Sequence, residues 1–294
     1  MAVRCLRVAR RHRADDTIAP VIVRLLGDGD TNALLAIQHA RAGLDSRWSQ
    51  AHLDDTLRDP ARGSGVNVRV AVENGQVAGA VGWVRGDVEF FAAPFLAADA
   101  AAARVLVDLS LLQARGASWI RVSVGEPDSE VTEVLRERGF TLHSEMIELA
   151  RATEDTTSDL VTTPVAAADR EQLLELYNST FRDVPNALPI DREELDAFIA
   201  SSFAEASCVI PGGFLIARDH GQHAEIYVTG VDVEHRGRGL GRAMVMRAVG
   251  AAFRAGIPEI RASVSSLNAA SLELHTRCGF APKFRRFVWQ RELT

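Results

Sequence analysis

Residues 231–242, Val-Asp-Val-Glu-His-Arg-Gly-Arg-Gly-Leu-Gly-Arg, decide the fold of this chain. An apolar run over residues 226–231 leads into them and predicts a strand. Apolar residues recur behind them at helical spacing, at Leu240, Met244, Val245, Ala248, Val249 and Ala252. Glycine allows backbone conformations that other residues avoid, and a helix start offers free N–H groups at the positive end of its dipole. The stretch therefore predicts a strand, a turn that binds an anion such as a pyrophosphate, and a helix.

Residues 236–241 resemble the acyl-CoA-binding motif of the GNAT superfamily of N-acetyltransferases, Arg/Gln-x-x-Gly-x-Gly/Ala. The resemblance implies acetyl-CoA as co-substrate, bound by the strand backbone at Val231 and Val233 and by the loop residues Arg236, Gly237, Arg238, Gly239, Leu240, Gly241 and Arg242. A Walker loop would end in Gly-Lys-Ser/Thr, which is absent here. A dinucleotide fingerprint needs a different glycine spacing and an acidic residue about 20 positions on.

A second segment, residues 268–280, resembles the GNAT pattern Asn-x-x-Ala/Ser-x-x-Leu/Phe-Tyr-x-x-x-Gly-Phe. Asn268 is a predicted helix cap and Gly279 a predicted helix stop. The resemblance adds Asn268 and Ser271 to the expected CoA contacts. Position 275 departs from the pattern, because the chain has His275 where the family usually has a tyrosine that protonates the departing thiolate.

Acetyl transfer to an amine requires a base, and the leaving thiolate can require an acid. Glu225 is the candidate base, since some family members carry a glutamate at the start of this strand. His275 is the candidate acid, because an ordinary histidine titrates near neutral pH. Tyr227 lies on the same strand face as Glu225 by alternation and is expected to line the acceptor pocket or to pack. The alternatives without a catalytic role are that Glu225 is a surface carboxylate and that His275 is a histidine on the helix surface.

The composition limits the classes of partner. The 294 residues carry a net charge of -6. The chain therefore lacks the excess of basic residues typical of a nucleic-acid-binding protein. An acidic surface instead suits a cationic amine substrate. No run of about 20 apolar residues occurs, so we predict no membrane span. Three cysteines without metal spacing indicate a reduced, cytoplasmic compartment and no metal site, and His220 and His223 flank a turn without a third ligand. The alanine- and arginine-rich composition suggests a bacterial source, and residues 1–19 are expected to be a disordered tail.

A shift of 140 residues aligns the chain weakly with itself: 119–124 with 259–264, and 139–140 with 279–280. Such self-similarity predicts a duplicated domain. The shift places Leu96, Asp99 and Ala101 opposite Arg236, Gly239 and Gly241, and Leu135 opposite His275. The N-terminal copy is therefore expected to have lost its chemistry.

The expected fold is α/β with mixed sheets: a degenerate GNAT-like domain at 20–150, a linker at 151–159 and a GNAT acetyltransferase domain at 160–294. The arrangement is similar to the tandem domains of mycothiol synthases. The resemblance implies an acetyl-CoA-dependent N-acetyltransferase that acts on a small primary amine in its C-terminal domain, as a monomer or homodimer. The alternatives are a protein lysine or N-terminal acetyltransferase and a non-catalytic acyl-CoA-binding sensor.

Overall fold

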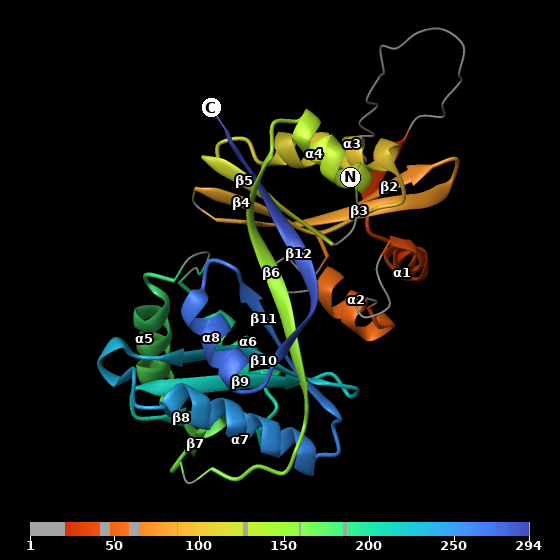
Figure 1. The fold of residues 1–294 in the computed structure, drawn as a ribbon. Coiled ribbons are helices and arrows are strands. Elements are labelled where there is room, and N and C mark those ends of the chain that lie inside the picture. The colour runs from red at the N-terminus through yellow and green to blue at the C-terminus, as the bar shows by residue number, and fades with distance from the viewer. Residues whose placement is uncertain are drawn as a thin grey trace, which may run out of the picture. The chain divides into compact units, whose positions relative to one another are not determined.

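The computed structural model describes residues 21–41, 48–58, 65–86, 88–125, 129–158, 160–184, 187 and 189–293, so the predicted tail at 1–19 lies outside the described residues. The chain forms two compact units (Figure 1). Unit 1 comprises Met1–Glu145 and Arg285–Thr294, and unit 2 comprises Met146–Phe284.

Unit 1 is a mixed sheet with helices on both faces. Its strands, in sheet order, are β1 (Ile22–Leu25), β2 (Val68–Glu73), β3 (Gln76–Arg85), β4 (Glu89–Ala97), β5 (Trp119–Gly125) and the C-terminal part of β12 (Ala281–Glu292). Its helices are α1 (Asp30–Arg41), α2 (Gln50–Leu57), α3 (Ala100–Gln113) and α4 (Ser129–Glu137). Leu34, Leu53 and Leu57 pack α1 and α2 against one face, whereas α3 and α4 pack against the other through a core that includes Leu106 and Leu135.

Unit 2 repeats this plan. Its strands, in sheet order, are the C-terminal part of β6 (Thr141–Ala152), β11 (Glu259–Ser265), β10 (Ala224–Val231), β9 (Gly213–Asp219), β8 (Cys208–Ile210) and β7 (Thr163–Pro164). Its helices are α5 (Arg170–Phe181), α6 (Arg192–Ala200), α7 (Leu240–Arg254) and α8 (Ala269–Arg277). In each unit one central pair is parallel, β4 with β5 and β10 with β11, and the remaining described pairs are antiparallel.

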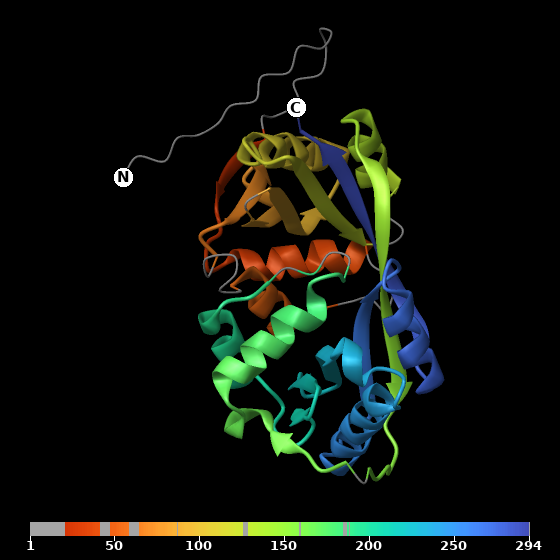
Figure 2. The same ribbon diagram turned by 90° about the vertical axis from the view of Figure 1, so that its left-hand side faces the viewer.

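Alternation along β9 separates the two layers of unit 2. Phe214 and Ile216 point into the core beneath α5 and α6, and Leu215 and Ala217 point into the core beneath α7. Figure 2 shows α5 and α7 on opposite sides of this sheet. Arg218 continues the series and therefore belongs to the α5–α6 face.

Local signals explain where several elements begin and end. Asp191 and Glu194 form a capping box at the start of α6, and Asp169 caps α5. Asn74 and Gly75, with φ of 51° and 78°, form the turn of the β2–β3 hairpin. These boundaries were predictable because each depends on only a few neighbouring residues.

The compact units are not consecutive halves of the chain. Residues 286–292 of β12 pair with β5, and residues 146–152 of β6 pair with β11. The strand that ends the first sequence repeat, β6, therefore pairs in unit 2, and the strand that ends the second repeat, β12, pairs in unit 1. The division of the chain into two consecutive domains with a linker at 151–159 remains a prediction. Arg151 and Ala152, expected in the linker, belong to β6.

Candidate active site

The turn between β10 and α7 has the geometry of an anion cradle. Gly237 and Gly239 have φ of 75° and 78°, a region that favours glycine, and no heavy atom lies within 4 Å of where a Cβ would stand on either. Within the described part of the chain, none of the backbone N–H groups from Gly237 to Arg242 donates a hydrogen bond. The N–H of Ala243, which follows, donates to the Gly239 carbonyl at 3.0 Å. Free N–H groups at the positive end of a 15-residue helix are suited to bind a phosphate.

Two arginines help to shape this turn. The Nε of Arg236 donates to the Val231 carbonyl at 3.0 Å, and a terminal nitrogen of Arg238 donates to the Glu234 carbonyl at 3.1 Å. Both side chains are held near the turn by these bonds, and Arg242 is exposed in the first turn of α7. The turn and the first turn of α7 therefore contribute three arginine side chains near the free N–H groups.

The other residues predicted to bind CoA lie at the end of β10 with the turn after it, and at the start of α8. The Val231 carbonyl is already bonded to Arg236, and Val233 is 64% exposed in the turn. Asn268 caps α8 by accepting from the Ser271 N–H at 3.1 Å, as predicted. Gly241 allows α7 to approach α8, since a Cβ there would lie 3.3 Å from a Leu274 methyl carbon. CoA binding by these residues remains a prediction.

Strand β10 changes its pairing just before this turn. Its parallel pairing with β11 covers only Ala224, Glu225 and Ile226, although β10 continues to Val231. On its other edge a bulge separates Ile226 from Val228, which makes Tyr227 the inserted residue. The β11-facing backbone groups beyond Ile226 thus lack parallel ladder partners among the described residues, and they can bind an extended arm or a carbonyl oxygen.

Glu225 forms a hydrogen-bonded pair that the sequence reading missed. Its Oε2 lies 3.1 Å from Nε2 of His220, and the His220 ring stacks on His223 with centroids 4.9 Å apart. The carboxylate is 25% exposed, so it is neither buried nor a fully solvated surface group. The pair could have been predicted from the short turn between β9 and β10, because such a turn brings positions 220 and 225 close together.

Tyr227 is 38% exposed and stands among aromatic and cationic groups. Phe198 approaches its ring edge-on at 5.0 Å between centroids, and the Arg218 guanidinium lies 3.5 Å from its ring centroid. Nearby Tyr177 is partly buried among apolar residues, and this desolvation raises the pKa of its phenol to about 12. Sequence reasoning did not single out Arg218, which could have been placed on this face only from the register of the β9–β10 pair.

His275 is buried, not at the helix surface. Its Nδ1 lies 2.8 Å from the Ser271 carbonyl, and since a carbonyl can only accept, Nδ1 carries the proton. Its Nε2 is buried without a hydrogen-bond partner, and burial lowers the pKa of the imidazole below its ordinary value. The acid role expected from the sequence would need a second proton on this buried ring, so we do not carry it into the proposal below.

The corresponding part of unit 1 has no cradle. Eight residues connect β10 to α7, whereas only two, Ala98 and Asp99, connect β4 to α3. The Asp99 carboxylate itself caps α3, accepting from the Ala102 N–H at 2.8 Å. By strand register, Phe91 stands where unit 2 has Glu225, since each pairs with the matching arginine of the next strand, Arg121 or Arg261. Leu96 is therefore not the counterpart of Arg236, because six residues of the connection are missing.

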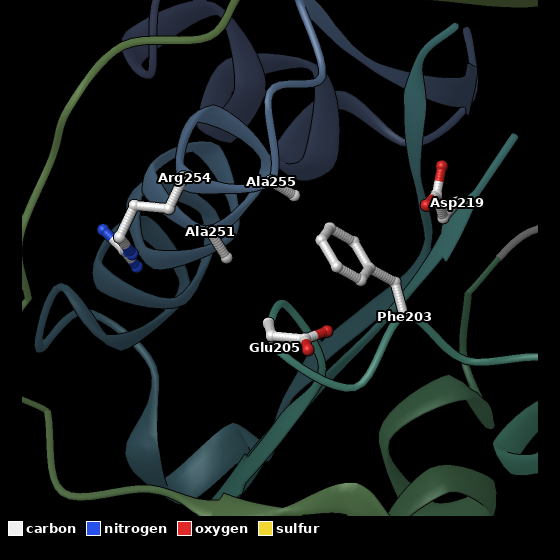
Figure 3. Close-up of a pocket in the computed structure, with 6 residues that line it drawn as sticks. All are labelled: Phe203, Glu205, Asp219, Ala251, Arg254 and Ala255. Atoms are coloured by element: carbon white, nitrogen blue, oxygen red, sulfur yellow. The ribbon is translucent and has the colours of Figure 1, made fainter. Parts of the chain in front are cut away.

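A pocket of about 430 Å³ lies away from this turn, beside the C-terminal end of α7 (Figure 3). Its lining residues are Phe203, Glu205, Asp219, Ala251, Arg254 and Ala255. None of them belongs to the predicted site, which surrounds the opposite end of the helix. No cluster of three metal-ligating side chains occurs in the described part of the chain, and none of its helices is both long and apolar enough to cross a membrane.

Comparison with known families agrees with this geometry. The acetyltransferase (GNAT) family model matches residues 170–280, from the start of α5 to just past the end of α8. This part of the chain belongs to the GNAT acetyltransferases. The protein is accordingly an acyltransferase, and enzymes of this family use acetyl-CoA.

Curated relatives extend the similarity beyond that domain. A mycothiol acetyltransferase of Clavibacter michiganensis is 25% identical over 301 residues, which cover 94% of this chain and 86% of that protein. One from Jonesia denitrificans is 25% identical over 189 residues, covering 56% of this chain and 60% of that protein. The first alignment runs through both repeats of the GNAT acyltransferase described here.

Solved structures share the fold over almost the whole chain. A GCN5-related N-acetyltransferase from Sphaerobacter thermophilus has a TM-score of 0.73 at 17% identity, covering 92% of this chain and 95% of that one. A tandem GNAT protein from the clavulanic acid biosynthesis pathway has a TM-score of 0.64 at 14% identity, covering 92% and 98%. The tandem GNAT fold is therefore established for this chain.

Proposed function

We propose that the protein transfers an acetyl group from acetyl-CoA to the primary amine of a small molecule, and that unit 2 alone carries the active site. The observation that carries this proposal is the turn at residues 236–242, with its free N–H groups at the start of α7. Unit 1 has two residues and an Asp99 cap in the same place. A carboxylate that already bonds a helix start excludes a second anion there by repulsion.

The chain supplies groups for each chemical requirement. The turn N–H groups and the exposed arginines bind the pyrophosphate. The unpaired edge of β10 beyond Ile226 offers backbone donors to the thioester carbonyl, whose oxygen gains negative charge during attack. Glu225 lies two residues before this edge begins, so a proton leaving the amine has a nearby acceptor.

His220 has a positioning role in this scheme. Its hydrogen bond to Oε2 limits the orientations of the Glu225 carboxylate. His220 is 19% exposed at a hairpin turn, which gives a proton taken up by Glu225 a route to solvent through the imidazole. The leaving thiolate needs no protein acid in this scheme, because a thiolate is a stable leaving group near neutral pH. It can take its proton from water.

The test is acetyl-CoA consumption over a panel of primary amines, with wild type, Glu225→Gln and Glu273→Gln. Glu273 is a matched control, since it is a 61% exposed glutamate of α8 paired with Arg277. We expect Glu225→Gln to lower kcat by about 100-fold or more, the usual effect of a lost general base, and the control to leave it unchanged. Turnover that survives Glu225→Gln would remove Glu225 from the mechanism.

The names of the curated relatives favour a second candidate acceptor, the deacetylated form of mycothiol. Including it in the panel compares it directly with simple amines. A kcat/KM far above that of every other amine would assign the protein to that reaction. The cytoplasm is the compartment we propose in either case, because Cys208 and Cys278 are both free and buried.

A further inference from the structure

Arg218 stands beside the proposed base, and none of the carboxylates in the described ranges forms an ion pair with it. It lies directly opposite Glu225 in the β9–β10 register, and cross-strand neighbours of this kind have Cβ atoms about 5 Å apart. The two side chains do not pair in the described structure, where Glu225 bonds His220 instead. The Nε of Arg218 is buried and has no hydrogen-bond partner.

Aromatic rings fix the orientation of this guanidinium. Its central carbon lies 3.5 Å from the centroid of Tyr227 and 5.9 Å from that of Phe198. Stacking on a ring uses the face of the guanidinium and leaves its N–H edge available, and this edge matches the two oxygens of a carboxylate. An unpaired, partly desolvated cation is costly, so the arrangement is suited to a ligand that supplies the missing charge.

The surroundings indicate the rest of the ligand. Tyr177 lies 5.6 Å from Phe214, 4.9 Å from Phe181 and 6.3 Å from Phe198 between ring centroids, which forms an aromatic cluster between α5, α6 and the sheet. Its phenol is neutral at physiological pH, as an ordinary tyrosine is, and burial raises its pKa further, so it adds no competing anion. Arg218 thus has the proposed base as its cross-strand neighbour and aromatic rings against its guanidinium.

We propose that the acceptor amine carries a carboxylate, which Arg218 binds, so that the substrate class is an amino-acid-like primary amine with an apolar side chain. A carboxylate suits the site better than a phosphate, because a dianion costs more to remove from water. The register places the amine near Glu225 when the carboxylate lies on Arg218. This inference rests on the proposed function, since it names the acceptor of that same site.

The test uses 3-phenylpropionate, which offers the carboxylate and an apolar body but no amine, and measures its binding by calorimetry. The wild-type protein is expected to bind it at least about tenfold more tightly than the uncharged amide 3-phenylpropanamide, since a charge-assisted hydrogen bond contributes that much. Arg218→Gln should lose this preference. Arg277→Gln should keep it, because Arg277 is a 73% exposed arginine in a surface pair.

Equal binding of the acid and the amide by the wild type would overturn the inference, and so would no binding of either. This comparison of ligands needs no variant, so it holds even if Arg218→Gln fails to fold. Acetyl-CoA binding is measured separately on the same samples. Acid-selective binding without acetyl-CoA binding would refute the proposed function while keeping the anion site, and the reverse result would refute only the anion site.

Discussion

At the scale of single residues, His275 shows how burial decides protonation. The ring is 2% exposed, its Nδ1 donates to the Ser271 carbonyl, and Phe280 meets it edge-on at 5.2 Å between centroids. Such a histidine is neutral in the folded protein because charging it would leave a buried cation. Its sequence neighbours could not reveal this, since position 275 follows Leu274 and precedes Thr276 in an amphipathic helix whose depth depends on unit 2 as a whole.

Protonation of His275 predicts a pH dependence of stability. Because its pKa is lowered on folding, the unfolded chain binds the proton first as the pH falls below the ordinary value of 6.5. Stability contributed by the neutral ring is therefore present above that pH and is lost progressively below it, down to the folded pKa. We expect urea unfolding at about pH 7.5 and about pH 5.5 to show a smaller acid loss for His275→Leu than for wild type.

His275→Leu copies Leu135, the buried residue at the matching position of unit 1, so it is suited to the helix and to a core. Equal losses of the free energy of unfolding in the two proteins would show that the histidine is charged in the fold, or is not buried.

At the scale of elements, α7 joins the site to the core of unit 2. Its N-terminal turn forms the cradle, and Met244, Val245, Ala248 and Val249 are buried against the sheet. The segment 153–156, which the sequence predicted as part of a linker, packs along its C-terminal half. The Thr156 hydroxyl donates to the Met246 carbonyl at 2.6 Å, and Thr153 N–H donates to the Pro258 carbonyl at 3.0 Å. A polar segment without periodicity gave no sign of this contact, because threonine hydroxyls and backbone groups make it and neither leaves an apolar pattern in the sequence.

Gly250 permits the contact between α7 and Thr156, because it has no side chain, and we therefore expect its substitution to destabilise the fold. A Cβ at this position would lie 2.1 Å from the Thr156 carbonyl oxygen, a backbone atom that cannot rotate away. Gly250→Ala should lower the free energy of unfolding by about 2 kcal/mol, although alanine favours a helix by about 1 kcal/mol. Gly241→Ala in the same helix is the control, because its nearest neighbour is the flexible Leu274 side chain. Equal urea midpoints for the two variants would contradict the packing described here.

At the scale of the whole molecule, the duplication was visible in the sequence but its details were not. From α3 and α7 onward the shift of 140 residues holds, since α4 and α8 and also β5 and β11 follow it. Before α3 and α7 the shift no longer aligns matching residues, because the β4–α3 connection is six residues shorter than the β10–α7 connection. A comparison that allows no gaps cannot detect this difference. The Arg-Gly-Arg-Gly-Leu-Gly turn was predictable because local backbone chemistry fixes it, whereas the pairing of β12 with β5 depends on contacts between distant residues.

We propose that one cradle per chain, at residues 236–242, binds acetyl-CoA. Calorimetric titration of acetyl-CoA into wild type, Gly239→Asp and Gly256→Asp tests it most directly. Gly239→Asp introduces the residue that unit 1 has as Asp99. Gly256 is the matched control, because it has φ of 76° and open space around its Cβ position just beyond the other end of α7.

We predict one site per chain in wild type and in Gly256→Asp, and binding weakened at least about 100-fold in Gly239→Asp, because a carboxylate in the cradle repels the pyrophosphate at close range. Two sites per chain, or equal affinity in all three proteins, would contradict the account.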